Sequence, residues 1–559
     1  MTLSSVAART PDGHSLFDNL SLAFGRERTA VVGRNGVGKT TLLRLVAGLA
    51  EPAEGTVARA GTVGWLAQAY EPAAGEAVAD TLGAAEALAL LGRVLAGEGF
   101  VEDMAEAEWT LEAQLDEALA QVGLTGLALD RLTASLSGGE QTRLRLAGLM
   151  LASPDLIVLD EPTNHLDVEA RALVADVVGR WPGGVLTVSH DRGLLRRMDR
   201  IVELSSLGAR VYGGGWDLYV ERRDAERAAA ERDLESAERE VGRAAREAQT
   251  ALEKKAKRDK AGRAHRAGTS DPKIMLDAKA QRAEESGARE GRLADRRRAE
   301  VEAQLIEARE RVERARRLSV PMPSTGLAAG KAVLALDGLE WRSPEGRLIV
   351  GPVTLRLSGP ERVAITGPNG AGKTTLLKLI SGELEPTAGR IERPVTAALL
   401  DQTAAILRPD ETLIEAWRRL NPEGTPNEAH AALARFLFRN TAAHRTVGTL
   451  SGGERLRAAL ACVMTGAKPP QLLILDEPTN HLDLESIGAV EAALAAYDGA
   501  LMVVSHDRDF LDAVGVEREL SAGAGGLHGA VKKYSAIGAM GEARLLSFSP
   551  WDRVARKEG

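Results

Sequence analysis

The chain has 559 residues, enough for two or three domains that each bury a core, and its 44% apolar and 27% charged residues are typical of a soluble globular protein. A single cysteine, Cys462, excludes a disulfide framework, a cysteine zinc site and an iron–sulfur cluster. The net charge is −8, yet residues 221–317 carry 27 Lys and Arg against 22 Asp and Glu, so one segment is basic on an acidic body.

The first residues, MTLSSVAARTPDG, lack the charged and then apolar pattern of a secretory signal. No apolar run approaches the roughly 20 residues that span a bilayer. The apolar stretches, such as DLIVLD and QLLILD, are short and typical of buried strands. We therefore expect a cytoplasmic protein without a membrane span.

In chain order, the first motif is GRNGVGKT at residues 33–40, between a predicted strand and a predicted helix. Glycines let backbone N–H groups converge on phosphates at a helix N-terminus, whose dipole favours negative charge. Lys39 would reach the β and γ phosphates, and the Thr40 hydroxyl would bind Mg²⁺. The predicted nucleotide-binding residues here are Gly33, Asn35, Gly36, Gly38, Lys39, Thr40 and Thr41.

The stretch 71–118 comes next and includes VEDMAEAEWTLEAQLDEAL, which is rich in Ala, Leu and acidic residues. From Lys39 to Ser137 there are 98 positions, whereas the equivalent interval in the second half of the chain, Lys373 to Ser451, has 78. The first half thus contains about twenty extra residues. We expect a short helical insert that faces protein or solvent rather than RNA.

The next motifs are LSGGEQTRLRLA at 136–147, the buried strand LIVLDEP, and VSHDR at 188–192. The strand delivers two adjacent acids whose side chains point to opposite faces. Asp160 is expected to bind Mg²⁺, and Glu161 to orient or deprotonate the attacking water. A histidine at a strand end is usually structural, but His190 belongs to a repeated set, so we expect it to contact the γ phosphate.

Residues 217–317 are polar, rich in Ala, Glu and Arg, and are interrupted by AGTSDP at 267–272. Apolar residues recur at steps of three and four in the second part, which is typical of a coiled-coil seam, and at steps of seven in the first. These are Val301, Leu305, Ala308, Val312 and Ala315, and Leu234, Val241 and Ala248. We expect two antiparallel helices, each roughly 60–70 Å long, joined at a basic tip. The alternative is a solvated, disordered linker.

The second half of the chain repeats the first: LDEPTNHLD stands at 159–167 and again, letter for letter, at 475–483. GPNGAGKT, LSGGERLRAALA, LLILDEP and VSHDR follow in the same order, so one α/β domain is duplicated. The equivalent residues are Gly367, Asn369, Gly370, Gly372, Lys373, Thr374 and Thr375 for the nucleotide, Thr374 and Asp476 for the metal, and Glu477 and His506 for catalysis.

These motifs resemble those of ATP-binding cassette domains, over about 1–215 and 330–520, and LSGGE is the most specific of them. In that family the LSGGE serine and glycines cap the γ phosphate bound by the opposite domain. The resemblance implies that Ser137, Gly138 and Gly139 complete the site of Lys373, and that Ser451, Gly452 and Gly453 complete that of Lys39. It also implies Mg²⁺- and water-sensing glutamines at Gln68 and Gln402, and a loop linking the two sites at Asp167 and Asp483.

Specificity for adenine is also implied by the resemblance. Phe17 stands at a suitable distance before the first glycine loop to stack on a base, whereas residues 348–351 contain no aromatic residue.

Among soluble relatives, excision-repair and ribosome-recycling cassette proteins need cysteine clusters, and the chromosome-cohesion type splits its cassette. The chain resembles the ABC-F family, which has tandem cassettes, TNHLD after the catalytic glutamate, here at 163–167 and 479–483, and an interdomain hairpin of about this length. The resemblance implies two phosphate-loop (P-loop) NTPase domains joined by a long antiparallel α-helical hairpin: cassettes at 1–216 and 321–520, the linker at 217–320 and a short tail at 521–559.

The resemblance further implies an ATPase, with ATP and Mg²⁺ as cofactors, that binds the ribosome as a monomer when its paired cassettes close on ATP. The linker would act on tRNA and the peptidyl-transferase centre, in translation regulation or antibiotic resistance, with hydrolysis for release. The expected RNA contacts are Lys254, Lys255, Lys257, Arg258, Lys260, Arg263, Arg266 and Lys273.

Three alternatives remain open. The basic tip is a solvated helix end; the chain is the ATPase subunit of a transporter with separate membrane proteins; or it is a nucleic-acid-remodelling ATPase, stimulated by naked DNA with a steep salt dependence.

Overall fold

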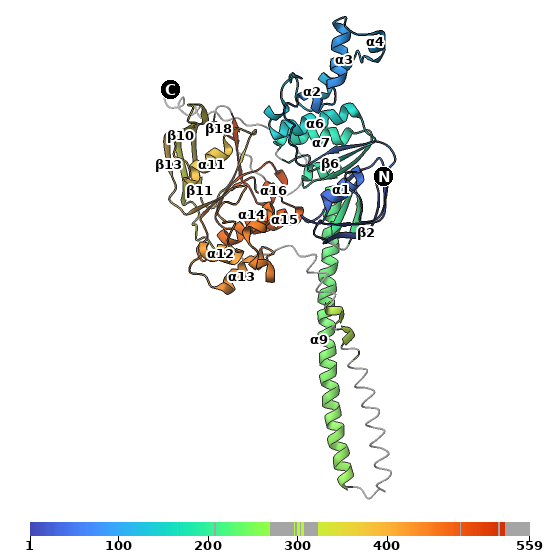
Figure 1. Cartoon of the computed structure of the whole chain (residues 1–559). Coiled ribbons are helices and arrows are strands. Elements are labelled where there is room, and N and C mark those ends of the chain that lie inside the picture. Colours follow the sequence, from blue (N-terminus) through green and yellow to red (C-terminus); the bar gives the residue numbers. More distant parts are fainter. Residues whose placement is uncertain are drawn as a thin grey trace, which may run out of the picture. The chain divides into compact units, whose positions relative to one another are not determined.

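The computed structural model describes residues 1–164, 166–205, 208–268, 296, 299–301, 303–306, 322–480, 482–523 and 526–530. The chain forms two compact units, one containing Met1–Trp216 and Leu318–Gly559, the other containing Asp217–Arg317. The first unit holds both halves of the repeat, which we call domain 1 (residues 1–215) and domain 2 (residues 322–530) (Figure 1).

The described part of domain 1 contains two sheets, and the larger combines parallel strands with one antiparallel edge strand. Its strands are β1 Thr2–Arg9, β2 Ser15–Ala23, β3 Arg28–Val32, β4 Glu54–Ala58, β5 Val63–Leu66, β6 Leu156–Asp160, β7 Gly184–Val188, β8 Arg200–Ser205 and β9 Gly208–Gly213. Its helices are α1 Lys39–Ala47, α2 Val78–Thr81, α3 Ala85–Leu95, α4 Val101–Glu106, α5 Leu111–Gln121, η1 Thr133–Ser135, α6 Gly138–Ala152, α7 Val168–Arg180 and α8 Arg192–Leu195.

Domain 2 repeats this order of elements. Its strands are β10 Ala332–Arg342, β11 Leu348–Ser358, β12 Arg362–Thr366, β13 Ala388–Glu392, β14 Ala397–Leu400, β15 Leu472–Asp476, β16 Ala500–Val504, β17 Arg518–Gly523 and β18 Gly526–Ala530. Its helices are α11 Lys373–Ser381, α12 Leu413–Leu420, α13 Pro426–Arg435, η2 Asn440–His444, η3 Val447–Thr449, α14 Gly452–Met464, α15 Leu484–Ala495 and α16 Arg508–Ala513.

The sheet topology is the same in both domains. The larger sheets run β5-β6-β7-β3-β8-β9 and β14-β15-β16-β12-β17-β18, and the smaller ones β2-β1-β4 and β11-β10-β13. Strand β3 is parallel to β7 and β8, and β12 is parallel to β16 and β17. The loops after β3, β6 and β7 therefore leave the sheet at one edge, where ligands of open α/β sheets bind.

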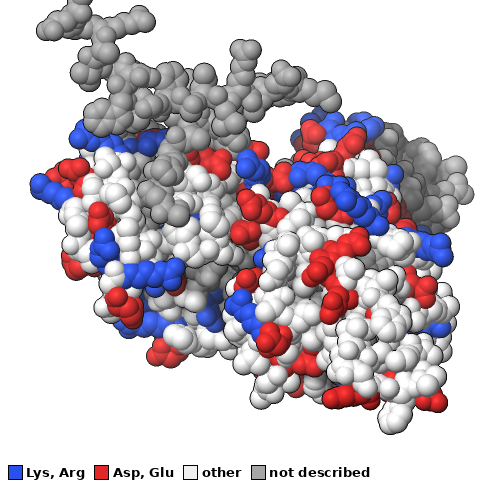
Figure 2. All heavy atoms as spheres, turned by 90° about the horizontal axis from the view of Figure 1, so that it is seen from above, with Lys and Arg blue, Asp and Glu red and all other residues white. Residues whose placement is uncertain are grey.

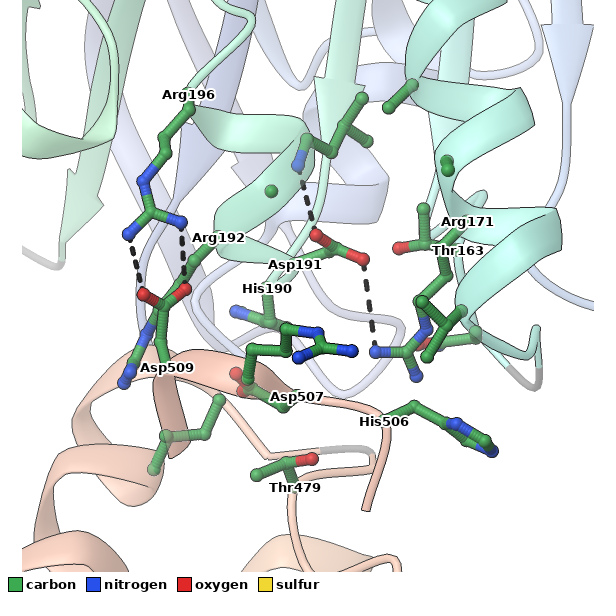
Figure 3. Close-up of a pocket in the computed structure, with 18 of the residues that line it drawn as sticks. Thr163, Arg171, His190, Asp191, Arg192, Arg196, Thr479, His506, Asp507 and Asp509 are labelled. Carbon is green, nitrogen blue, oxygen red and sulfur yellow. Dashed lines mark hydrogen bonds and ion pairs between the residues drawn. The ribbon is translucent and has the colours of Figure 1, made fainter. Parts of the chain in front are cut away.

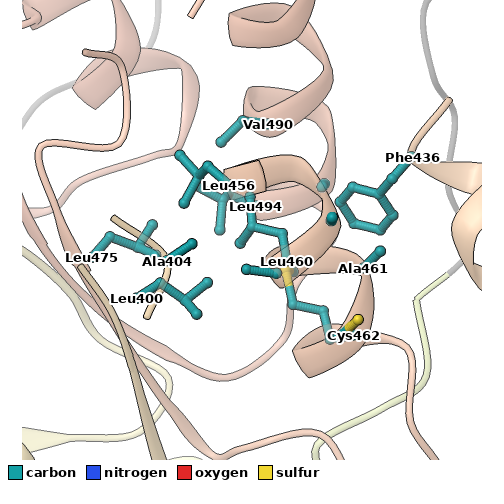
Figure 4. Close-up of a cluster of buried hydrophobic side chains, with 14 of the residues drawn as sticks. Leu400, Ala404, Phe436, Leu456, Leu460, Ala461, Cys462, Leu475, Val490 and Leu494 are labelled. Carbon is teal, nitrogen blue, oxygen red and sulfur yellow. The ribbon is translucent and has the colours of Figure 1, made fainter. Parts of the chain in front are cut away.

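The central strands are hydrophobic because both of their faces are covered. Every residue of β6 and β15 is buried, as continuous apolar runs in a parallel sheet require. In domain 2 the buried side chains of α14 and α15 pack against this strand, and Cys462 lies among them (Figure 4). The lone cysteine is thus a core residue, and its burial raises the pKa of the thiol.

The extra helices of domain 1 are α3 and α4, which Figure 1 shows projecting from the domain. Several large apolar side chains of this segment are exposed, including Phe100 at 76% and Val101 at 79%. The expected insert at 71–118 therefore contains helices, and the surface they add is apolar as well as acidic.

The linker begins with α9, Trp216–Gly268, a helix of 53 residues that extends for roughly 80 Å. It is longer than the 60–70 Å expected, because it begins at Trp216 and continues through Gly242 without a break. The less exposed residues Ala230, Leu234, Ala237, Val241 and Ala244 recur at steps of four and three, as in a coiled-coil seam.

Most of the predicted second arm and most of the tail after residue 520 lie outside the described residues, so the antiparallel pairing stays a prediction. None of the helices in the described part of the chain combines the length and the hydropathy needed to cross a bilayer.

Candidate nucleotide-binding sites

Each glycine loop follows a central strand and ends at a helix N-terminus. Gly33 has φ +153° and Gly367 has φ +137°. A Cβ at either position would lie 2.3 Å from a backbone oxygen, that of Leu204 or Ala522, so only glycine fits. The N-cap residues of α1 and α11, Gly38 and Gly372, make no side-chain cap hydrogen bond. The first-turn N–H groups are therefore left for an anion.

The two loop lysines are buried within these loops, each with 8% of its surface exposed. Lys39 Nζ donates to Gly33 O at 2.6 Å and Arg34 O at 3.2 Å. Lys373 Nζ donates to Gly367 O at 2.7 Å. Burial lowers the pKa of both lysines while neighbouring acids raise it. Each ammonium group thus sits inside a glycine cradle, where a phosphate would be its counter-charge.

The acids at the ends of β6 and β15 lie beside the threonines of the glycine loops. Thr374 Oγ1 donates to Asp476 Oδ2 at 2.7 Å. Burial raises the pKa of Asp160 and of Asp476, whereas hydrogen bonds from Thr40 and Thr374 lower it. A hydroxyl next to a carboxylate is a ligand pair that suits Mg²⁺ in P-loop proteins, so these residues fit that metal.

The next residues, Glu161 and Glu477, adopt an unusual backbone conformation. Their φ angles are +49° and +47°, in the left-handed region that costs a residue with a side chain about 1–3 kcal/mol. Their N–H groups donate to Val188 O and Val504 O, each at 2.9 Å. The strand ends are thus tied to the neighbouring strands.

Each of these glutamates faces the histidine of VSHDR. His190 Nε2 lies 3.1 Å from Glu161 Oε1, and His506 Nε2 lies 3.2 Å from Glu477 Oε1, the latter without the alignment of a hydrogen bond. Burial raises the pKa of Glu161 to about 8 and that of Glu477 to about 7. Burial also lowers the pKa of His190 to about 3 and that of His506 to about 4.

Both histidines are therefore neutral at neutral pH, with one ring nitrogen available to donate and one to accept. Glu477 Oε2 and His506 Nδ1 are buried without a hydrogen-bond partner among the described residues. Such atoms are suited to hold a water molecule or a phosphate oxygen.

We call Lys39, Asp160, Glu161 and His190 site 1, and Lys373, Asp476, Glu477 and His506 site 2. The predicted glutamines lie at the same sheet edge. Leu66 pairs with Leu159 and Leu400 with Leu475, so Gln68 and Gln402 follow the strands next to the two aspartates.

The LSGGE serines cap the helices that follow them. Ser137 and Ser451 are the N-cap residues of α6 and α14, each in a capping box with the glutamate three residues on. Ser137 Oγ donates to Glu140 Oε2 at 2.7 Å. The two serines, with Gly138 and Gly452, thus stand exposed at helix N-termini, which favour anions. Their contact with the opposite site stays a prediction.

The two sites are linked by the aspartates that end LDEPTNHLD. Asp483 Oδ2 accepts from the N–H of Asn35 at 2.8 Å, while its Oδ1 accepts from the N–H of Ser486. Arg34, which the motif analysis did not single out, makes a bidentate ion pair with Glu485, at 2.5 Å for each contact. Asp167 also acts electrostatically on Lys373, raising the pKa of that lysine. Each domain therefore contacts or influences the glycine loop of the other.

A cavity of about 330 Å³ lies between these linking segments, and residues from both domains line it (Figure 3). His190 is on one side and His506 on the other, with arginines from α7 and α8 between them. Arg171 and Arg196 stand outside the motifs, and Arg192 ends VSHDR without being singled out, so the sequence patterns missed all three.

Phe17 does not serve as the expected stacking aromatic. It is 1% exposed on β2 and packs in the core beneath α1, where a Cβ at Gly38 would lie 3.0 Å from its ring. An apolar ring on an inward-facing strand position gains more from burial than from exposure to a base.

The predicted RNA-contact residues begin on α9. The side chains of Lys254, Lys257 and Lys260 are exposed, and their spacing of three spreads them over about 120° of the helix. Lys255, Arg258, Arg263 and Arg266 also belong to α9, but their side chains lie outside the described set, as does the whole of Lys273.

Comparison with known proteins agrees with this geometry. The sequence matches the family described as "ABC transporter" at residues 17–164 and 350–480. The chain is 33% identical to the tylosin resistance ATP-binding protein TlrC of Streptomyces fradiae, with 91% of this chain and 94% of that protein covered. It is 32% identical to the energy-dependent translational throttle protein EttA of Mycobacterium tuberculosis, with 89% and 87% covered.

A plant relative, ABC transporter F family member 2 of Arabidopsis thaliana, is 30% identical over 90% of this chain and 73% of that protein. Among solved structures, the archaeal ribosome recycling factor aABCE1, in complex with the ribosomal stalk protein aP1, matches with a TM-score of 0.56 at 20% identity. That match covers 94% of this chain and 89% of the other, and it shows that the tandem arrangement of two such domains is shared.

Proposed function

The chain belongs to the ABC-F family of ATP-binding cassette ATPases, and we propose that it is a cytoplasmic, monomeric factor that binds the ribosome while its two domains are closed on ATP. It hydrolyses ATP to ADP and phosphate, as members of this class do. The finer proposal concerns what the hydrolysis drives, and it is supported by the paired sites, by the linker and by the relatives.

The residues of each site have separate tasks in the proposed cycle. The backbone N–H groups at the start of α1 and α11, together with Lys39 and Lys373, bind the phosphates. Thr40 with Asp160, and Thr374 with Asp476, would hold Mg²⁺, with Gln68 and Gln402 beside them; the ion would offset charge on the β and γ phosphates.

Glu161 and Glu477 would orient the attacking water and take its proton, because their buried carboxylates have pKa values raised towards neutrality. His190 and His506, which are neutral, would donate to the γ phosphate. Ser137 and Ser451 would cap the phosphate bound by the opposite domain at the N-termini of α6 and α14. Closure of the two domains on each other would therefore require a nucleotide in each site.

We propose that the linker is the part of the chain through which this cycle acts on the ribosome. It is connected along the chain to domain 1 at one end and to domain 2 at the other, so movement of one domain against the other changes the separation of its ends. Its exposed lysines at 254, 257 and 260 suit a phosphate backbone. Figure 2 shows both acidic and basic side chains on one face of the cassettes.

The observation that carries the proposal is similarity along nearly the whole length of two relatives whose names concern antibiotic resistance and translation. Both names fit a factor that acts on the translating ribosome. We propose that the linker reaches tRNA or the peptidyl-transferase centre, either to regulate translation or to protect it from a drug.

The test uses the double variant Glu161→Gln/Glu477→Gln, which should bind ATP without completing hydrolysis. The purified full-length variant is mixed with 70S ribosomes and run on a sucrose gradient with ATP, with ADP or without nucleotide. We expect co-migration with ribosomes only with ATP. A folded, ATP-bound variant that stays at the top of the gradient contradicts the proposal and directs the search to separate membrane proteins.

A second experiment tests the linker. Lys254, Lys257 and Lys260 are changed together to Gln in the same background. The matched control changes Arg232, Arg239 and Arg243 to Gln on the same helix, and two of those arginines pair with glutamates one turn away. We expect the lysine variant to lose at least tenfold in ribosome affinity and the control to lose less than threefold. Equal losses would show that overall charge, rather than this segment, matters.

A further inference from the structure

The glycine loops of the two sites differ at their second residue. GRNGVGKT has Arg34 at the position where GPNGAGKT has Pro368. Proline carries no charge and no backbone N–H, so it can neither form an ion pair nor donate a backbone hydrogen bond. The residues predicted to bind the nucleotide are the same in both loops. The two loops therefore share their phosphate-binding groups and differ in a charge beside them.

Arg34 lies against the start of α15, a helix of domain 2. Its Nε and Nη2 donate to Glu485 Oε2 and Oε1, each at 2.5 Å. Two parallel hydrogen bonds between a guanidinium and a carboxylate are among the strongest contacts of this kind, and they fix the orientation of both groups. Glu485 stands in the first turn of α15, two residues after the N-cap Asp483. The loop of site 1 is thus joined directly to domain 2.

The next residue of the loop is held by the same helix. Asp483 Oδ2 accepts from the N–H of Asn35 at 2.8 Å, while Asp483 Oδ1 caps α15 by accepting from the N–H of Ser486 at 2.8 Å. On the inner side of the loop, Lys39 Nζ donates to Arg34 O at 3.2 Å and to Asn35 Oδ1 at 3.3 Å. Two consecutive loop residues are therefore fixed between the lysine of site 1 and the start of α15.

The opposite helix, α7 of domain 1, carries the same two acids. Asp167 is its N-cap residue, and Glu169 stands in its first turn. An acid at this place is favoured by the helix dipole alone, which gives both helices a structural reason for it. The loop residue that corresponds to Arg34 is Pro368, which cannot pair with Glu169. The duplication is thus broken on the side of the loop and kept on the side of the helix.

The setting of the Arg34–Glu485 pair decides how much it contributes. Its side chains are 70% and 40% exposed, and an isolated ion pair so exposed contributes little, because ordering two long side chains costs entropy. Here the neighbouring Asn35 is already tied to Asp483, so the backbone that carries Arg34 is fixed before the pair forms. Bidentate geometry and a shared anchor are the conditions under which an exposed pair matters.

We propose that Arg34 is a positioning residue that fastens the glycine loop of site 1 to domain 2, so that ATP leaves site 1 more slowly than it leaves site 2. Release of ATP from the closed chain requires domain 2 to move away from the loop, and the Arg34–Glu485 pair must break in that step. The inference rests on the proposed function, since it concerns the same closed state.

The test measures release from each site of the purified, full-length Glu161→Gln/Glu477→Gln chain, without ribosomes. The chain is loaded with 8-azido-ATP, chased with unlabelled ATP and irradiated at intervals, and peptide mass spectrometry measures the label on each domain. We expect domain 1 to lose label at least threefold more slowly than domain 2. Adding Arg34→Gln should speed the loss from domain 1 about fivefold, equivalent to about 1 kcal/mol, and change domain 2 less than twofold.

Three further variants separate the ion pair from other effects. Glu485→Gln removes the partner without altering the loop, and we expect it to speed release from site 1 as Arg34→Gln does. An effect of bulk charge on the phosphates would act in opposite directions in these two variants. Combining them should add nothing to either alone, because both break the same pair. Arg34→Lys keeps the charge but loses the fork, so its release rate should lie between those of the parent and Arg34→Gln.

The matched control is Glu169→Gln, which removes the equivalent acid of α7. It should change release from either site less than twofold. The proposal is wrong if Arg34→Gln leaves release from site 1 unchanged, if it speeds both sites equally, or if the effects of Arg34→Gln and Glu485→Gln simply add. Should Arg34→Gln fail to fold, Glu485→Gln against Glu169→Gln decides. The ribosome-binding test asks where the chain sediments, so failure there leaves these release rates interpretable, and failure here leaves ribosome binding untouched.

Discussion

Domain 1 and domain 2 agree at the edges of their sheets and differ at the surfaces that they turn toward each other. At the sheet edges the lysine, threonine, aspartate, glutamate and histidine of each site take the same positions. Across the interface, Arg34, Arg192 and Arg196 of domain 1 pair with acids of domain 2, while Arg508 of domain 2 lines the same cavity. Arg192 pairs with Glu491 at 2.7 Å, and Arg196 makes a bidentate pair with Asp509 at 2.9 and 2.6 Å.

The reverse of the last two pairs, with the acid on domain 1, cannot form, because domain 1 has no acid at the equivalent positions. The residue of domain 1 that corresponds to Glu491 is Ala175, and the one that corresponds to Asp509 is Gly193. The groups that touch a phosphate must be the same in both copies, because the chemistry is the same. The two interface surfaces need only be complementary. The arginines of a pair can therefore lie on one domain and the acids on the other.

The largest effects should come from the carboxylates that both domains share. We expect Glu161→Gln/Glu477→Gln to reduce the steady-state rate of phosphate release by roughly 10²–10⁴-fold, because each site loses its base. The single variants sharpen the comparison. If the two sites contribute equally, Glu161→Gln alone and Glu477→Gln alone should reduce the rate by similar factors. A double variant that retains its rate would show that neither glutamate is catalytic.

The glycine loops should be equally intolerant of a side chain. We expect Gly33→Ala and Gly367→Ala each to weaken ATP binding at least tenfold, since the new Cβ would meet a backbone oxygen at 2.3 Å. The cost in stability should be about 1–3 kcal/mol. The matched controls are Gly13→Ala and Gly346→Ala, outside the glycine loops, where φ is also positive but a Cβ meets nothing within 4 Å.

The two control variants introduce only the strain of a side chain at a positive φ, without a close contact to the backbone. Nucleotide binding by equilibrium titration and unfolding by denaturant check both pairs of variants. If the control alanines cost as much as the test alanines, close approach of the backbone is not the reason for the glycines.

Removing the arginine of one interface ion pair should cost more than removing that of the other. Arg192→Gln removes the positive charge that pairs with the mostly buried Glu491, so we expect a cost of about 1–3 kcal/mol, or roughly a five- to 150-fold weaker apparent affinity for ATP. Arg196→Gln should cost under about 1 kcal/mol, since its pair with Asp509 is more exposed. The measurement is ATP affinity in the non-hydrolysing double variant. The reverse order would mean that burial does not control these pairs.

The smallest effect should be a change in the stability of the chain with pH. Glu161 of site 1 should contribute more to this change than Glu477 of site 2. Burial raises the pKa of Glu161 to about 8 and that of Glu477 to about 7, from an ordinary value of 4.5. The folded chain then binds more protons than the unfolded chain between these values, so the free energy of unfolding falls as pH rises from about 4.5 to about 8. Glu161→Gln should flatten this fall more than Glu477→Gln does.

Thermal melting without nucleotide or metal checks this, at roughly 2–4 °C per kcal/mol for domains of this size. We expect the melting temperature at pH 8.5 to be higher in both variants than in the parent chain. A lower value in either would mean that the carboxylate stabilises the fold in its charged form.

Much of the fold and of each site can be predicted from local patterns. The glycine loops, the acidic strand ends and the VSHDR histidines are short motifs whose chemistry depends on neighbours in the chain, and their repetition identifies two domains. The position of Asp160 beside Thr40 also follows, because parallel strands bring their carboxyl ends to one edge.

Other features depend on packing between distant segments. The left-handed conformation of Glu161 is held by a bond to Val188 of the next strand, and Phe17 is buried because β2 packs beneath α1. Nothing in a motif indicates either.

The sequence by itself determined that this chain has two chemically equivalent sites, since every group that would touch a phosphate is present twice. Only the tertiary structure decided which segments of the two domains meet. Asp483 accepts from the N–H of Asn35 and Arg196 pairs with Asp509, although more than 300 residues separate the members of each pair. A charge acts through distance in space and through the solvent excluded between two groups. Those quantities exist only once the two domains have packed together.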